Sequence, residues 1–164
     1  MREKFTNRLN TYQEADIPIL YIDESGFAHD MPRTHGYAPI GSRCVGKHDW
    51  QAKGRTNVIG ALLGSCLLSV CLFNGSINSD VFLAWLTQDL LPKVTETSVI
   101  VMDNASFHKS EAIHKAITDA GHCLEYLPVY SPDLNPIEHK WAQAKAIRRR
   151  CQCSVDELFQ KNNL

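Results

Sequence analysis

The sequence predicts an α/β fold in which a sheet of about five strands is flanked by helices. Apolar or β-branched segments of strand length occur in the order strand, long loop, two strands, helix, strand, helix, strand, helix. Two of these segments end in an aspartate, and the last leads through prolines into a helix. The 164 residues are 44% hydrophobic and 21% charged, which suits one domain with a proper core. We expect that domain over residues 17–164, after a lead-in segment over residues 1–16.

The first predicted strand covers residues 17–27 and ends in an acidic pair. The lead-in before it is polar and has no long apolar period, so we expect an irregular segment or a frayed helix there. Because side chains alternate along a strand, Asp23 and Ser25 share one face and Glu24 lies on the other. An aspartate at this position either faces the crevice where α/β sheets place their sites or caps the following turn.

The next part of the chain is a long loop followed by an uncharged stretch. Residues 28–54 are rich in Gly, Pro, His and basic side chains, and a loop of this length is usually functional or disordered. Residues 58–73 are almost wholly apolar, which raises a transmembrane helix as an alternative. Sixteen residues fall short of the ~20 that a span needs, so we favour two buried strands joined near Gly64 and Ser65.

The second half alternates helices with strands. Ser79 and Asp80 are predicted to cap a helix over residues 81–91, which Pro92 closes. The later elements are a strand over 98–103 ending in Asp103, a helix over 111–120 ending at Gly121, a strand over 123–127, and a short last helix that begins with the capping box of Ser154 and Glu157.

Residues 127–141 have the sequence pattern of a strand end, followed by a turn and the start of a helix. Asn135 is predicted to be the N-cap and Pro136 the first helical residue, which places Glu138 in the first turn. A carboxylate there is favoured by the helix dipole, whether it is a positioned acid or a solvated one. Residues at helical spacing should pack this helix on the sheet: Ile137, Trp141, Ala144 and Ile147.

These predictions bring three acids to one edge of the sheet. Asp23 and Asp103 end two buried strands, and Glu138 begins the helix that follows a third. Mutual repulsion makes such a cluster unfavourable without cations, and hard oxygen ligands suit Mg²⁺ or Mn²⁺. Two such ions about 4 Å apart can activate a water or hydroxyl and stabilise the leaving oxygen of a phosphodiester. We therefore predict a catalytic metal site at these acids.

The net charge of −1 argues against binding nucleic acid by bulk positive charge, yet the basic residues are clustered. Lys145 and Arg149 should form a rail on the helix of Glu138, or else a solvated face. The residues predicted to contact DNA are Lys140, Lys145, Arg148 and Arg149 in one cluster and Arg43, Lys47 and Lys53 in the other.

The pattern of cysteines and histidines argues against a zinc-binding module. Six cysteines without a signal peptide or a regular framework favour buried free thiols in a reducing compartment, so we expect a cytosolic protein without a membrane partner. No C-x₂-C pair occurs. His108 follows Asp103 in a loop, and it either approaches the site as an auxiliary residue or caps that loop.

With these motifs in view, the chain resembles the catalytic domain of a DDE transposase of the mariner superfamily, in its bacterial insertion-sequence branch. The motifs are YIDESGF with Asp23, VMDNASFH with Asp103, and SPDLNPIE ending at Glu138. Thirty-four residues separate Asp103 from Glu138, a spacing typical of that branch. The likeness runs from about residue 17 to residue 150, and the last motif is highly specific.

The resemblance implies an RNase H-like mixed sheet and two Mg²⁺ or Mn²⁺ ions at Asp23, Asp103 and Glu138. It implies nicking of transposon ends and transfer of the freed 3′-hydroxyl to target DNA, commonly at TA dinucleotides, without a covalent enzyme intermediate. Relatives contact a partner subunit or DNA where residues 28–54 lie, so we expect a homodimer. In that loop Tyr37 stands where relatives often have Trp.

Family members also carry an N-terminal helix-turn-helix region that recognises the terminal repeats. Residues 1–16 are too short to supply it, so we expect either a separately encoded helix-turn-helix chain or a truncated copy. Two alternatives remain at this point. One is a different RNase H-like nuclease, such as a hybrid hydrolase or a junction resolvase, which would lack the SPDLNPIE motif. The other is an inactive remnant that only binds a partner.

Overall fold

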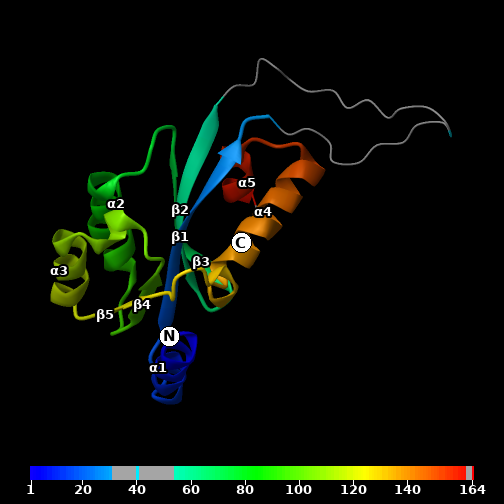
Figure 1. The fold of residues 1–164 in the computed structure, drawn as a ribbon. Helices are drawn as coiled ribbons and strands as arrows, with labels where there is room; N and C mark the ends of the chain where they lie inside the picture. The colour runs from blue at the N-terminus through cyan, green and yellow to red at the C-terminus, as the bar shows by residue number, and fades with distance from the viewer. Residues whose placement is uncertain (31–39, 41–53, 162–163) are drawn as a thin grey trace.

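A computed structural model describes residues 1–30, 40, 54–161 and 164 of the chain (Figure 1). One sheet organises the molecule, with the strand order β3-β2-β1-β4-β5. Pairing is antiparallel between β1 and β2 and between β2 and β3, and parallel between β1 and β4 and between β4 and β5. The strands are β1 Ile19–Ala28, β2 Arg55–Leu63, β3 Cys66–Phe73, β4 Val99–Met102 and β5 Cys123–Tyr126. The predicted α/β fold with a mixed five-stranded sheet is confirmed.

Helices cover both faces of this sheet, as Figure 1 shows with the sheet seen nearly edge-on. On one face lie α2 Ser79–Trp85 and α3 Glu111–Asp119, which close a core that contains Leu20, Ile22 and Ile59. On the other face lie α4 Ile137–Cys151 and α5 Val155–Lys161, which pack on Phe27, Val58 and Leu62. Even-numbered residues of β1 therefore point to α2 and α3, and odd-numbered ones point to α4 and α5.

The segment before β1 forms helix α1, Arg2–Glu14. Its Phe5 side chain is buried in a third cluster with Val99, Val101 and Leu127. The Arg8 guanidinium also donates to both carboxylate oxygens of Glu125 in β5, at 3.0 and 2.9 Å. Packing and this bidentate ion pair together fix α1 beneath the parallel half of the sheet.

The uncharged stretch forms β2 and β3, which meet at Gly64 and Ser65 as the sequence predicts. Gly64 has a φ of 60°, the left-handed conformation that a tight hairpin turn requires. The transmembrane alternative is thereby excluded for this stretch, because it is two strands of the central sheet. Within the part of the chain that the structure describes, no helix is long and apolar enough to cross a membrane.

Two helix starts differ from the prediction. Asn78, rather than Ser79 or Asp80, caps α2, because its side chain accepts a hydrogen bond from the Val81 N–H at 2.9 Å. After Trp85 the helix widens into a π-helical turn, Leu86–Leu90, and closes as a 3₁₀ turn, Leu91–Lys93. Helix α4 begins at Ile137 with Pro136 before it, and the Asn135 side chain makes no cap.

The C-terminal end confirms one predicted motif. The Glu157 N–H donates to Ser154 Oγ at 3.2 Å, and Glu157 Oε2 accepts from the Ser154 N–H at 3.1 Å, which is the reciprocal pattern of a capping box.

The thiols depart from the expectation of burial. Cys66, Cys123 and Cys151 are free and exposed, because they lie at a strand start or a helix end rather than on a core-facing position.

Candidate active site

Strands β1 and β4 lie side by side and point the same way, which brings two of the predicted acids together. The parallel register pairs Tyr21 with Val101. Continued by two residues, it sets Asp23 beside Asp103, which directly follows β4. Both positions are odd-numbered and therefore belong to the face that α4 covers.

A pocket of about 330 Å³ opens at this edge of the sheet and is lined by all three predicted acids. The rest of its lining comes from Asn104 and Ala105 after β4 and from the loop between β5 and α4, which carries the SPDLNPIE motif. The acids are Asp23, Asp103 and Glu138, and the loop residues are Leu127, Pro128, Val129, Tyr130, Ser131, Pro132 and Asn135. The expectation that three carboxylates meet at one edge therefore agrees with the pocket lining.

Asp23 is the buried member of the cluster, at 8% exposure. Its Oδ2 atom accepts a hydrogen bond from the Trp141 indole N–H at 3.2 Å. The indole reaches this oxygen across Gly60, which is paired with Asp23 in the β1–β2 ladder. A Cβ atom at position 60 would lie 2.5 Å from Trp141 Cη2, closer than atoms can approach. Only a glycine therefore lets Trp141 lie over the sheet and hold Asp23.

Asp103 is more open, with 47% of its side chain exposed, and it is held from the other layer. Its Oδ1 atom accepts from the Ala105 N–H at 2.8 Å and lies 2.7 Å from His108 Nδ1. His108 comes from a 3₁₀ turn, Ser106–Lys109, and is fully buried. Its other ring nitrogen, Nε2, lies 2.8 Å from Glu24 Oε1.

These surroundings move the pKa values of the two aspartates in opposite directions. Burial, followed by the charge of Glu138, raises the pKa of Asp23 to about 7. The hydrogen bond from His108 lowers the pKa of Asp103, against the opposing effect of burial. Burial alone would lower the pKa of His108, but its hydrogen bonds to Asp103 and Glu24 raise it to about 9. His108 is therefore a cation at neutral pH.

Glu138 lies in the first turn of α4, as predicted, and is exposed at the mouth of the pocket. A 3₁₀ turn, Pro132–Leu134, precedes the helix and turns Asn135 so that its backbone carbonyl accepts from the Glu138 N–H at 3.1 Å. The Asn135 side chain, expected to be the cap, instead lines the pocket, and its buried Oδ1 atom has no hydrogen-bond partner within the described residues.

The donor set fits a hard divalent cation. Carboxylate and amide oxygens are the ligands that Mg²⁺ and Mn²⁺ take, and the orphaned Asn135 Oδ1 adds one to the three acids. Burial and, after it, the negative charges of Glu138 and Glu24 raise the pKa of Asp23. Over residues 1–30, 40, 54–161 and 164, however, no group of three His, Cys, Asp or Glu side chains is arranged so that it could hold a metal ion. Glu138, being exposed, is the acid that is free to turn.

The predicted DNA-binding residues fall into different environments. Lys145 is half-buried, with its ammonium 5.4 Å from the centre of the Phe27 ring, whereas Arg149 is exposed. Lys140 is half-buried near the start of α4. The cluster of Arg43, Lys47 and Lys53 lies outside the described residues.

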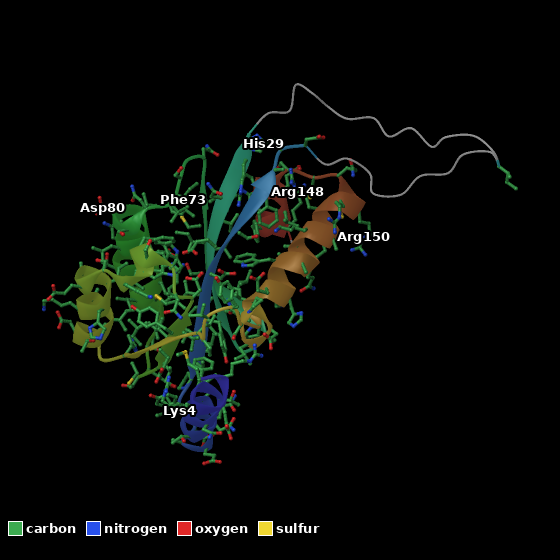
Figure 2. The ribbon with its side chains drawn as sticks, viewed as in Figure 1. Lys4, His29, Phe73, Asp80, Arg148 and Arg150 are labelled. Atoms are coloured by element: carbon green, nitrogen blue, oxygen red, sulfur yellow. The ribbon has the colours of Figure 1, made fainter. Side chains whose placement is uncertain are left out.

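Arg148 requires a correction. Its side chain is buried, at 7% exposure, and its guanidinium donates to the carbonyls of Ala28 at 2.7 Å and Cys153 at 3.3 Å. Figure 2 shows it where the end of β1 meets α4, whereas Arg150 lies farther along at the outer end of the helix. Arg148 thus satisfies carbonyls inside the protein rather than DNA phosphates. Charge alone suggested a DNA contact, but its spacing of four residues from Ala144 places it on the buried stripe.

Three residues of the site were missed by sequence reasoning in their actual roles. Trp141 was predicted only to pack and Glu24 only to lie on the opposite face, and no role in the site was predicted for Gly60. Alternation along β1 and a glycine inside β2 were the available signals, and a strand glycine often marks a close approach. Neither signal names the partner on another element.

Comparison with known proteins agrees with this geometry. A family profile described as DDE superfamily endonuclease matches residues 18–158. A search of curated proteins finds no significant match.

Among solved structures, similar folds occur in Mos1 transposase. A Mos1 transposase paired-end complex with left transposon end has a TM-score of 0.73 at 18% identity, covering 90% of this chain and 47% of that one. The mariner Mos1 paired end complex with Mg gives 0.70 at 18%, covering 88% and 47%. The Mos1 catalytic domain with Raltegravir and Mg gives 0.65 at 14%, covering 97% and 76%. The chain thus spans about half the length of the first two, and the likeness establishes the RNase H-like fold.

The family is assigned by the profile, which covers the chain from the start of β1 to α5 and includes all three acids that line the pocket. The order of strands, the placement of the acids and the solved structures of similar fold are all consistent with it. The chain therefore belongs to the DDE superfamily endonucleases.

Proposed function

We propose that this chain is the catalytic domain of a mariner-type transposase, which cuts DNA strands at transposon ends and joins the freed 3′-hydroxyl to target DNA. The observation that carries the proposal is that Asp23, Asp103 and Glu138, from three separate elements, line one pocket. A pocket of acids would repel DNA phosphates, so it suits this reaction only when divalent cations neutralise it.

Asp23, Asp103 and Glu138 would hold Mg²⁺ or Mn²⁺, with two ions as the proposed number. When bound, such ions supply a nucleophilic water or hydroxyl and stabilise the leaving oxygen. The chain's own residues prepare this site: Trp141 and His108 orient the two aspartates before any cation arrives. Such fixed orientation is worth much in phosphoryl transfer, where positioning and electrostatics carry most of the rate.

The proposed partner is DNA, namely transposon ends and target DNA. Recognition of the terminal repeats would come from a helix-turn-helix region elsewhere, and the working unit would be a homodimer. The proposal draws support from the solved Mos1 complexes, whose names record a transposon end, Mg and Mn.

A nicking assay tests the catalytic assignment. Asp103→Asn keeps the shape of the side chain but removes one ligand charge, so we expect Mg²⁺-dependent nicking of a supercoiled plasmid to fall by a factor of at least about 10³, with Mn²⁺ affinity also reduced. Asp119→Asn is the matched control, because Asp119 is exposed on α3 and forms a surface ion pair with Lys115. Undiminished nicking by Asp103→Asn would overturn the assignment.

The rail along α4 has its own test. Lys145→Ala combined with Arg149→Ala should weaken DNA binding and lower the slope of log affinity against log salt by roughly two. Lys115→Ala with Lys161→Ala removes two exposed cations from other helices and should leave the slope unchanged. If the rail variant keeps the original slope, the DNA path runs elsewhere, past residues 43–53.

A further inference from the structure

Glu24 follows Asp23 in the chain but lies on the opposite face of the sheet. In the β1–β2 ladder it pairs with Ile59, whose side chain belongs to the core under α2 and α3. Its side chain is 19% exposed, so most of it is removed from water. An acid in this position needs a partner, and the described structure gives it one in His108.

His108 is enclosed on every side that the structure describes. Its ring packs against Phe82 and Phe107, with centroids 4.6 and 4.2 Å apart, and its backbone carbonyl accepts from the Tyr126 hydroxyl at 3.0 Å. The ring is therefore fixed in place and in rotation. With both carboxylates ionised, each ring nitrogen must donate, because an ionised carboxylate only accepts. Glu24 and Asp103 are thus joined through a doubly hydrogen-bonded imidazolium.

This arrangement selects one oxygen of Asp103. Oδ1 accepts both the His108 Nδ1–H and the Ala105 N–H, at 2.7 and 2.8 Å. Neither contact uses Oδ2. Oδ1 is thus engaged on the protein side, whereas Oδ2 accepts no hydrogen bond from the described residues and can face what enters the pocket.

We propose that Glu24 is a positioning residue of the active site, which acts through His108 to hold Asp103 with Oδ2 available to a divalent cation. The inference rests on the proposed function. One strand then serves the site twice: Asp23 enters the pocket directly, and Glu24 supports the neighbouring acid from behind. Such outer-shell carboxylate–histidine contacts commonly fix metal ligands and are worth 10- to 100-fold in affinity.

The test compares Glu24→Ala and Glu24→Gln with wild type. Mn²⁺ is titrated into the whole chain, and its binding is monitored by electron paramagnetic resonance. We expect Glu24→Ala to weaken Mn²⁺ binding about tenfold, and Glu24→Gln, which keeps an acceptor for His108 Nε2, to recover much of that loss. DNA affinity measured without metal should not change. The metal concentration at half-saturation should change by a larger factor than the turnover rate at saturating metal. A purely structural role would instead lower the melting temperature and leave the metal midpoint in place. Glu96→Ala, on an exposed loop, is the matched control.

A second measurement keeps the inference separate from the proposed function. The ¹³C signal of the Asp103 carboxylate and the ring N–H signals of His108 report the contact without any metal. Both should shift in Glu24→Ala. Unchanged signals, or a Mn²⁺ midpoint equal to wild type in Glu24→Ala, overturn the inference. A wild-type chain that neither binds Mn²⁺ nor cuts DNA overturns the proposed function, and the carboxylate signal then decides alone whether Glu24 positions Asp103.

Discussion

Asp23 and Asp103 follow the same parallel register, yet the protein surrounds them differently. Asp23 is buried, and the side chain that donates to its carboxylate is the neutral Trp141 indole. Asp103 is half-exposed and receives a cationic donor, His108, and a backbone N–H. The first pKa rises to about 7 and the second falls below its usual range.

The difference shows how two like acids in one pocket can have separated pKa values. Asp103 keeps its charge because His108 compensates it from behind, whereas Asp23 is the acid that holds a proton near neutral pH. Neighbouring carboxyls with separated pKa values are a feature of catalytic sites. A cation entering the pocket would displace that proton, so metal binding and proton release should be coupled.

Removing the positive charge of His108 beside Asp103 should have the largest effect on stability. The folded pKa of His108 is about 9, above the ordinary 6.5, so its stabilisation is fully present below pH 6.5 and is lost as the pH rises through 9. A difference of this size corresponds to roughly 3 kcal/mol. We expect the free energy of unfolding to fall between pH 7 and 9.5, measured by urea denaturation in EDTA.

The same measurement on His108→Gln should show a flatter pH profile over that window, because Gln does not titrate. His114→Gln, at an exposed position of α3, should keep the wild-type slope. Equal slopes for His108→Gln and wild type would mean that His108 is not held as a cation between the two acids.

Much of this comparison could be predicted from the sequence, and its limits have a physical cause. The apolar runs that lead into Asp23 and Asp103 predict a buried strand for each acid, because side-chain alternation is a local rule. The parallel pairing that brings the two strands together is a long-range property, which was expected and which the structure shows. The spacing of Ile137, Trp141 and Ala144 likewise predicts the buried side of α4, and all three are buried.

The contacts that separate the two acids could not be predicted in the same way. Glu24 and His108 are 84 residues apart, and Trp141 and Asp23 are 118 apart. Periodicity gives the face on which a side chain lies but not the residue that it meets there. For the same reason the positive charge of Arg148 suggested DNA, although its position on the helix directs it toward the Ala28 carbonyl.

The contact between the Trp141 indole N–H and Asp23 depends on Gly60. In Gly60→Ala the new methyl group would overlap Trp141, whose Cη2 and Cζ2 atoms lie 2.5 and 3.0 Å from it. Overpacking of this kind costs about 2 kcal/mol, and it should push the indole N–H away from Asp23. We expect a lower urea midpoint, altered Trp fluorescence and a still higher pKa of Asp23.

Gly75→Ala is the matched control, because no atom of the residues that the structure describes lies within 4 Å of a Cβ atom at that position. It should leave both the midpoint and the fluorescence close to wild type. A Gly60→Ala chain as stable as Gly75→Ala would show that the indole does not lie over β2 at this point.

The smallest expected effect is also the most direct contrast, since the same substitution should change stability in opposite directions at the two aspartates. The pKa of Asp23 is raised, so its contribution is most favourable below the unfolded value of 3.8 and is lost as the pH rises through 7. The pKa of Asp103 is lowered, so its stabilisation is present above 3.8 and is lost in acid. At pH 8 in EDTA, Asp23→Asn should therefore raise the melting temperature and Asp103→Asn should lower it.

We expect about 1 kcal/mol in each direction, or about 2–4 °C. The effect of burial at Asp23 is reduced because this side chain lines a pocket that water can enter, and exposed Glu138 can turn away from it. At Asp103 the side-chain amide oxygen introduced by Asp103→Asn would still accept a hydrogen bond from His108. Mg²⁺ should remove the advantage of Asp23→Asn, since a bound cation stabilises the ionised carboxylate that Asn lacks. Calorimetry of both variants at pH 4 and pH 8, with and without Mg²⁺, measures all of these differences. Shifts of the same sign at pH 8 would mean that the two acids share one electrostatic environment, and the contrast between the indole and imidazolium donors would have no consequence for stability.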